Sequence, residues 1–292
     1  MYIYNCLKDF FGKKLIENCI DNPILIIGMG RSGTSVLLQA LGKHPEIIAF
    51  PGEAPFLTSI GGNASLFISE LNNTNSEYYR SSLKTDIDYF HIALARLGVE
   101  TAGGKHYALK EYVKALWREK SFKQKKHWSA KTFPTEIVAK GLLSVYPNAK
   151  FIYIVRNGVD VVHSMTKFHG FKNKEFESHC HNWNDSIKKY RYLTKNDNAL
   201  FVRHEHLLSD PIVFFSTVFD FLNLSVDSMC IRFVTETLVH PLDQPTHHQL
   251  DAVKQLKDRE SPFKSWPVTH QDTFLAICSE SMKELGYTLP RT

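Results

Sequence analysis

This 292-residue sequence has few cysteines and no long apolar run. Its five cysteines include no Cys-x-x-Cys pair, so we expect reduced thiols and neither a disulfide framework nor a zinc site. No apolar run approaches the ~18 residues that a membrane-spanning helix needs, and we expect no transmembrane segment. Charges in residues 1–19 interrupt any signal-peptide core, which predicts a cytoplasmic chain without a cleaved leader.

Charge is nearly balanced, and this limits the class of partner. The net charge at pH 7 is +5 with histidine neutral. Such a mildly basic chain suits an anionic small ligand or an acidic acceptor, but the charge is too diffuse to indicate nucleic acid. The 43% hydrophobic fraction is typical of a globular protein and excludes disorder for most of the chain.

Short apolar runs alternate with helical patterns. The expected strands are 23–28, 47–50, 149–155 and 199–202. The expected helices are 36–42, 83–98, 107–120, about 159–168, 176–195, 211–223 and 274–287. This alternation predicts an α/β fold, a P-loop-like three-layer arrangement with a central, mostly parallel sheet flanked by helices. We expect a single domain over 1–292, with 59–125 as an insertion on the side where an acceptor substrate would bind.

A glycine-rich loop at 28–35 (GMGRSGTS) lies between a predicted strand and a predicted helix. In that context its backbone N–H groups and the helix N-terminus form a cradle for an anion. The loop matches both glycines and the final serine of the GxxxxGK[ST] motif, but Thr34 stands where a nucleotide kinase has lysine. Arg31 is the nearest cation instead.

The strand at 149–155 ends in Arg156, where a magnesium-dependent kinase would need an aspartate. A cation there is suited to a second phosphate and unsuited to a metal. The neighbouring histidines, such as His179 and His181, have no carboxylate or cysteine cluster beside them, so we expect no metal. Two anion sites without a metal indicate a nucleotide that carries phosphate at both its 5′ and 3′ positions.

Taken together, the motifs resemble those of the sulfotransferases that use 3′-phosphoadenosine 5′-phosphosulfate (PAPS). Residues 28–35 are similar to the 5′-phosphosulfate loop of that family, and IVRNGVDVVHSM at 154–165 is similar to its 3′-phosphate motif. HWSAKTFPTE (127–136), LFVRHEHLLSDP (200–211) and RESPFKSW (259–266) resemble three further segments in the family's order. The Arg-Ser-Gly-Thr of the loop is most similar to the tyrosylprotein and Golgi-type branch and to bacterial members.

The resemblance implies a role for each matching residue. The 5′-phosphosulfate would be held by Gly30, Arg31, Ser32, Gly33, Thr34 and Ser35, and the 3′-phosphate by Arg156 and Ser164. Lys131 would neutralise charge on the leaving oxygen, unless it is a surface lysine. Ser261 or Arg259 would close over the phosphosulfate, and Lys167 would either add a 3′-phosphate contact or be solvated. Glu205 is interpreted as structural, and His204 as a candidate for stacking on adenine.

The activity implied is in-line transfer of the sulfuryl group from PAPS to an acceptor hydroxyl, with PAP (3′-phosphoadenosine 5′-phosphate) as product and no metal. Catalysis would use Glu53 as general base, with Lys131 and Arg31 stabilising charge. Glu53 has the alternative of being a capping or surface residue. The acceptor, a sugar, alcohol, phenol or tyrosine, is left open, as is the oligomeric state. The competing functions are a P-loop kinase or NTPase and a non-catalytic PAP sensor.

Overall fold

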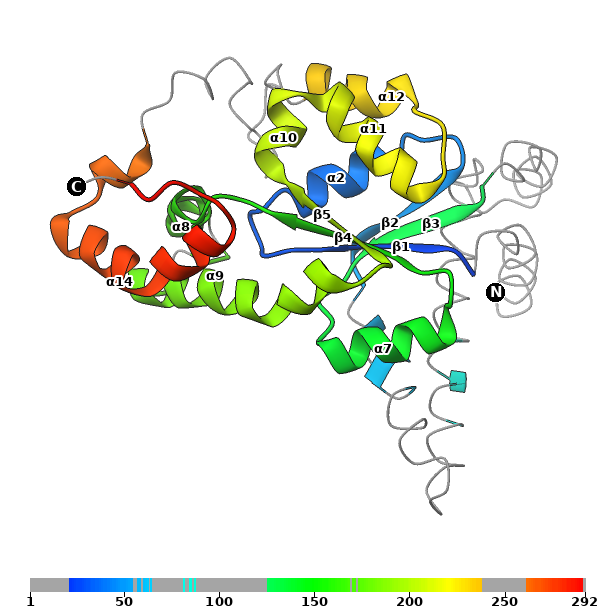
Figure 1. Ribbon diagram of the computed structural model, residues 1–292, viewed down its shortest axis with the longest axis horizontal. Coiled ribbons are helices and arrows are strands. Elements are labelled where there is room, and N and C mark those ends of the chain that lie inside the picture. The colour runs from blue at the N-terminus through cyan, green and yellow to red at the C-terminus, as the bar shows by residue number, and fades with distance from the viewer. Residues whose placement is uncertain are drawn as a thin grey trace, which may run out of the picture. The chain divides into compact units, whose positions relative to one another are not determined.

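Strands and helices alternate through the part of the chain that the computed structural model describes, namely 21–54, 125–168, 170–171, 173–237 and 261–290, with isolated positions between 57 and 87 (Figure 1). Five strands form one sheet in the order β2-β3-β1-β4-β5. The strands are β1 (Pro23–Ile27), β2 (Ile47–Glu53), β3 (His127–Lys131), β4 (Lys150–Val155) and β5 (Ala199–Arg203). The pairs β1–β3 and β2–β3 are parallel.

The predicted fold class is confirmed. All five side chains of β1 are buried, as expected of a parallel strand that is covered on both faces. The helices that connect the strands flank the sheet, which makes the chain an α/β protein with a mostly parallel central sheet.

The described chain forms two compact units. The first comprises 1–26 with 41–151, and the second comprises 27–40 with 152–292. The single domain over 1–292 stays a prediction, and so does the insertion at 59–125, which lies almost entirely outside the described residues.

The first unit contains two elements that the sequence did not predict, strand β3 and helix α7 (Glu136–Val145). Strand β3 reads HWSAK, with Trp128 as its one strand-favouring residue and no β-branched residue, so its sequence signal is weak. Burial of Trp128 and Ser129 places it in the core nevertheless. Thr135 caps the N-terminus of helix α7, and its hydroxyl accepts a hydrogen bond from the backbone N–H of Val138. The predicted helices at 83–98 and 107–120 lie almost wholly outside the described residues.

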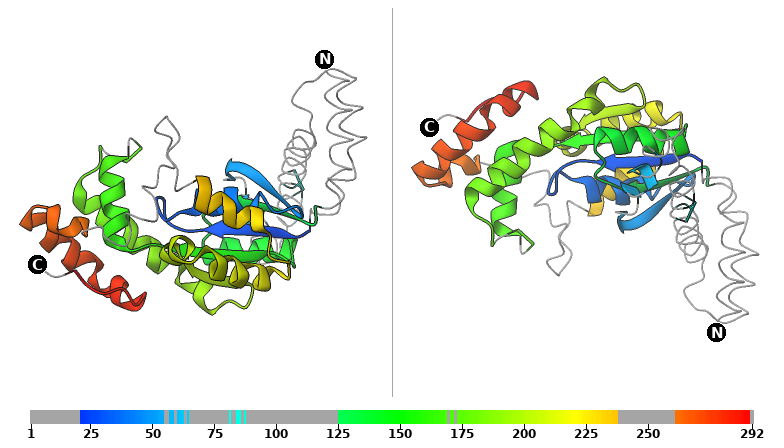
Figure 2. Two further views of the ribbon diagram at one scale, coloured as in Figure 1. Left: turned by 90° about the horizontal axis from the view of Figure 1, so that it is seen from above. Right: turned by 90° about the horizontal axis from the view of Figure 1, so that it is seen from below.

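The second unit holds the glycine-rich loop and most of the helices. They are α2 (Thr34–Leu41), α8 (Gly158–Lys167), α9 (Phe176–Tyr190), α10 (His204–Ser209), α11 (Pro211–Leu222), α12 (Ser228–Arg232) and α14 (Val268–Glu284), with short turns at Arg191–Lys195, Phe233–Thr237 and Pro262–Ser265. Helix α14 packs along α9, and α9 packs against α8, as Figures 1 and 2 show. The predicted helices of this unit are therefore present, with ends that differ by a few residues.

Candidate active site

The glycine-rich loop has a backbone that only glycine tolerates at two positions. A Cβ on Gly28 would lie 2.5 Å from the carbonyl oxygen of Ile154, and Gly33 has a φ of +91°. Arg31 also adopts a positive φ, +72°, which is uncommon for a residue with a side chain and is typical of strained functional loops. The loop leads directly into helix α2, and a glycine-rich loop followed by a helix N-terminus is an arrangement that can bind an anion.

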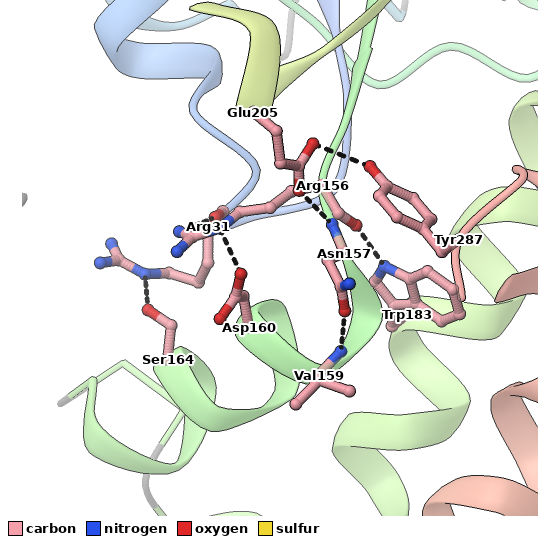
Figure 3. A network of polar contacts seen from close by, with 9 residues as sticks. All are labelled: Arg31, Arg156, Asn157, Val159, Asp160, Ser164, Trp183, Glu205 and Tyr287. Carbon is pink, nitrogen blue, oxygen red and sulfur yellow. Dashed lines mark hydrogen bonds and ion pairs between the residues drawn. The ribbon is translucent and has the colours of Figure 1, made fainter. Parts of the chain in front are cut away.

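Two arginines and a serine meet beside this loop (Figure 3). The Nε of Arg31 donates to the Oγ of Ser164 at 3.0 Å, and its guanidinium lies 4.3 Å from the ring centroid of Phe168. Arg156 donates from its Nη1 to the carbonyl oxygen of Arg31 at 3.2 Å. The structure thus brings together Arg31, Arg156 and Ser164, three of the residues that the sequence predicted to bind the nucleotide.

The charge of this cluster is positive and only partly compensated. Arg156 is 8% exposed, and its Nε lies 3.9 Å from an oxygen of Asp160. Burial, and then the neighbouring charge of Arg156, lower the pKa of Arg31. Two guanidinium groups held this close repel each other, and a phosphate would relieve that repulsion while accepting bidentate hydrogen bonds.

His204 fills the space behind the loop. An ideal Cβ on Gly33 would lie 2.3 Å from its Cδ2, so the imidazole and the loop are packed as closely as glycine allows. The ring is 2% exposed, and its Nε2 is a buried nitrogen without a hydrogen-bond partner among the described residues. Burial and then Arg156 hold the pKa of His204 well below 6.5, so this histidine is neutral at pH 7. The predicted stacking on adenine stays a prediction.

Three histidines with lowered pKa values, His204, His127 and His179, predict a loss of stability in acid. Burial also lowers the pKa values of His127 and His179. A group whose pKa is lower in the folded chain binds more protons when unfolded, so stability is retained above about pH 6.5 and falls as the pH drops below it, by up to about 1.4 kcal/mol per pH unit for each histidine. Urea unfolding at pH 7 and pH 5 measures this loss.

Variants assign that loss to a residue. His204→Gln removes one titrating group and should make the pH dependence shallower. His181→Gln makes the same substitution at an exposed histidine and serves as its control. An unchanged pH dependence in His204→Gln would refute the assignment.

Glu53 and Lys131 lie opposite each other at the carboxyl ends of neighbouring strands in the first unit. They are register partners on β2 and β3, and the pairing is irregular between Ala49 and Glu53. The backbone N–H of Ala54 donates to the carbonyl oxygen of Lys131 at 2.9 Å. Lys131 is only 9% exposed, which disfavours the alternative of a surface lysine. The structure describes the backbone of Glu53 and not its side chain, so its role as base stays a prediction.

Three further residues, Ser261, Lys167 and Arg259, were predicted to lie near the phosphates. The Oγ of Ser261 accepts a hydrogen bond from the N–H of Phe263, at the start of the turn Pro262–Ser265, and Ser261 is exposed. Lys167 is exposed in the last turn of α8, in keeping with a solvated lysine. Arg259 lies outside the described residues. Trp266 donates from its indole nitrogen to Nδ1 of His163 at 3.2 Å, which joins the segment after Ser261 to the helix that carries Ser164.

Glu205, which the sequence predicted to be structural, is hydrogen-bonded to two segments that are distant in the sequence. It accepts hydrogen bonds from the N–H of Asn157 and from the hydroxyl of Tyr287 (Figure 3). Asn157 directly follows Arg156, so Glu205 touches the backbone of the cluster. No local motif signals this arrangement, because Tyr287 is distant in the sequence from both residues.

Two features are absent from the part of the chain that the structure describes. The described residues contain no group of three or more His, Cys, Asp or Glu that could hold a metal ion. They also contain no helix that is both long and apolar enough to span a bilayer.

Three solved structures share this fold. The sulfotransferase domain of the Synechococcus PCC 7002 olefin synthase has a TM-score of 0.55 at 16% identity, over 92% of this chain and 96% of its own. The sulfotransferase domain from the curacin biosynthetic pathway has a TM-score of 0.52 at 16% identity, over 92% and 99%. Mouse sulfotransferase SULT7A1, complexed with PAP, has a TM-score of 0.51 at 13% identity, over 92% and 88%.

Sequence similarity leads to the same class of protein. A Caenorhabditis briggsae protein named "Putative protein-tyrosine sulfotransferase" is 24% identical over 221 residues, which are 72% of this chain and 68% of that protein. Residues 23–228, more than half of the chain, match the profile of the sulfotransferase family. The resemblance carried by the sequence motifs is therefore confirmed, and the chain belongs to the sulfotransferase family.

Proposed function

We propose that this chain transfers the sulfuryl group of PAPS to an acceptor hydroxyl and releases PAP. The cluster of Arg31, Arg156 and Ser164 beside the glycine-rich loop carries the proposal, because it supplies one partly buried and one buried guanidinium and a hydroxyl, groups that can bind a doubly phosphorylated nucleotide. The PAP bound to the mouse relative supports the same ligand.

Each phosphate has its own set of contacts in this proposal. The 5′-phosphosulfate lies on the N–H groups of the loop, from Gly30 to Ser35. The 3′-phosphate is bound by Arg156 and Ser164. Since the guanidinium of Arg31 already contacts Ser164, we assign it to the boundary between the two groups, where it neutralises charge on both.

The reaction needs an in-line displacement at sulfur. The acceptor oxygen forms a bond to sulfur while the bond from sulfur to the 5′-phosphate oxygen breaks, and the acceptor proton passes to the carboxylate of Glu53. Lys131 neutralises the charge that builds on the departing phosphate oxygen. PAP leaves with the electron pair of the broken bond, and no metal takes part.

The acceptor is a hydroxyl of a sugar, an alcohol, a phenol or a peptidyl tyrosine. The name of the Caenorhabditis briggsae relative supports tyrosine. A screen of acceptors of these four kinds with PAPS, in the presence of a metal chelator, should give a sulfated product and an equal amount of PAP from at least one class.

A parallel assay with ATP and Mg²⁺ separates the competing functions. Thr34 in the lysine position and Arg156 in the aspartate position disfavour a kinase or NTPase, so we expect no hydrolysis of ATP. Hydrolysis dependent on Mg²⁺ would contradict the proposal. Binding of PAP without transfer to any acceptor would indicate a sensor.

A further inference from the structure

The chain segment that follows helix α14 reaches the backbone next to Arg156. The helix ends in a turn in which the N–H of Gly286 donates to the carbonyl of Lys283 and the N–H of Tyr287 to that of Met282. Gly286 adopts a φ of +70°, the left-handed backbone conformation that favours glycine and often ends a right-handed helix. The turn directs Tyr287 away from the helix axis and toward Glu205 (Figure 3).

Arg203 holds the segment from the other side. Its guanidinium lies 4.8 Å from the centroid of the Tyr287 ring and donates a hydrogen bond to the carbonyl oxygen of Leu285. A Cβ on Gly286 would come within 2.9 Å of the same guanidinium. The position of the Tyr287 ring is therefore set by a cation–π contact and by the turn before it.

Tyr287 and Glu205 form two linked hydrogen bonds that end at the peptide bond between Arg156 and Asn157. The hydroxyl of Tyr287 donates to Oε2 of Glu205 at 2.9 Å, and Oε1 of Glu205 accepts the N–H of Asn157 at 2.8 Å. The carbonyl of the same peptide, that of Arg156, accepts from the indole nitrogen of Trp183 at 3.3 Å. Both polar groups of the Arg156–Asn157 peptide are thus bound by side chains, which fixes the direction in which the Arg156 side chain leaves the backbone.

We propose that Tyr287 and Glu205 are positioning residues for Arg156, and that the C-terminal segment thereby sets the affinity of the protein for the 3′-phosphate of its nucleotide. This rests on the proposed function, in which Arg156 binds that phosphate. Neither positioning residue contacts the nucleotide itself. Their effect passes through the peptide that they orient.

The hydrogen bond from Tyr287 to Glu205 is retained at neutral pH. Burial, and then Glu205, raise the pKa of Tyr287, so its hydroxyl keeps the proton that it donates. Without that donor, one oxygen of the Glu205 carboxylate loses its charge-assisted hydrogen bond, and the carboxylate is free to turn away from Asn157.

Tyr287→Phe tests the proposal, because it removes one oxygen and keeps the ring on Arg203. We expect PAP to bind about three- to tenfold more weakly, the worth of one hydrogen bond. Adenosine 5′-monophosphate, which has no 3′-phosphate, should bind as to the natural chain. Tyr153→Phe is the matched control, since Tyr153 is 1% exposed and its hydroxyl has no hydrogen-bond partner among the described residues. It should leave the affinity for both ligands unchanged.

A double-mutant cycle separates positioning from general support of the fold. With Arg156→Ala in place, Tyr287→Phe should change PAP affinity by less than about twofold. Equal weakening of both nucleotides, or a full effect of Tyr287→Phe in the Arg156→Ala background, would overturn the proposal.

The cycle also distinguishes failure of the positioning role from failure of the proposed function, in which Arg156 binds the 3′-phosphate. If Arg156→Ala weakens PAP selectively and Tyr287→Phe does not, only the positioning role fails. If Arg156→Ala leaves PAP binding intact, the assignment of Arg156 to the 3′-phosphate fails, and the positioning role fails with it. Glu205→Gln keeps an acceptor oxygen for Asn157 and should retain more PAP affinity than Glu205→Ala.

Discussion

Glu53→Gln should lower kcat by about 10²- to 10⁴-fold, the usual worth of a positioned general base. The substitution nearly preserves the shape of the side chain, so packing would not explain such a loss. The rate has to be measured with a saturating acceptor, because kcat then reports on chemistry and not on acceptor binding. PAP affinity should stay unchanged, since the proposed phosphate contacts do not include Glu53.

Glu46→Gln is the matched control for this experiment. Glu46 immediately precedes the same strand, β2, and pairs with Lys126 at 2.8 Å. The same chemical change there should leave kcat near the natural value. If Glu53→Gln keeps most of its kcat, Glu53 is not the base, and the proton is lost by another route. If PAP affinity falls together with activity, Glu53 supports the structure of the site instead.

Arg156→Ala should weaken PAP binding by about one to two orders of magnitude, because a hydrogen bond to a charged group contributes about 1.5–3 kcal/mol. Adenosine 5′-phosphosulfate has no 3′-phosphate and should bind almost as before. Calorimetry with both ligands gives the two affinities directly.

The control is Arg191→Ala, which removes a half-exposed arginine of the same unit that pairs with Glu284. It should leave both affinities unchanged. Equal losses for the two ligands in Arg156→Ala would mean that this arginine supports the loop through the carbonyl of Arg31, and does not read the 3′-phosphate.

The sequence predicted those parts of the site that are encoded by neighbouring residues. The glycines of the loop and the arginine at the end of β4 each follow a buried strand directly, so local patterns were sufficient to find them. The apolar strands β1 and β4 were recognised for the same reason. Ser164 was identified only through the resemblance to the sulfotransferase motif, and it lies in the helix that follows Arg156.

Contacts between distant segments could not be predicted in this way. The bond from Arg31 to Ser164 joins residues 133 positions apart, and that from Tyr287 to Glu205 joins residues 82 positions apart. The packing of His204 against Gly33 likewise depends on how β5 and the loop are folded. Strand β3 was missed because its burial arises from pairing with β1 and β2, and its five residues do not show it.

The account depends most on the claim that the arginine cluster and the glycine-rich loop bind one nucleotide through two separate phosphates. Calorimetry of the natural chain with PAP and with adenosine 5′-monophosphate, both in a metal chelator, tests it most directly. We predict that PAP binds without a divalent metal, and that removal of the 3′-phosphate weakens binding by about one to two orders of magnitude. Equal affinities for the two nucleotides, or loss of PAP binding in the chelator, would contradict the account.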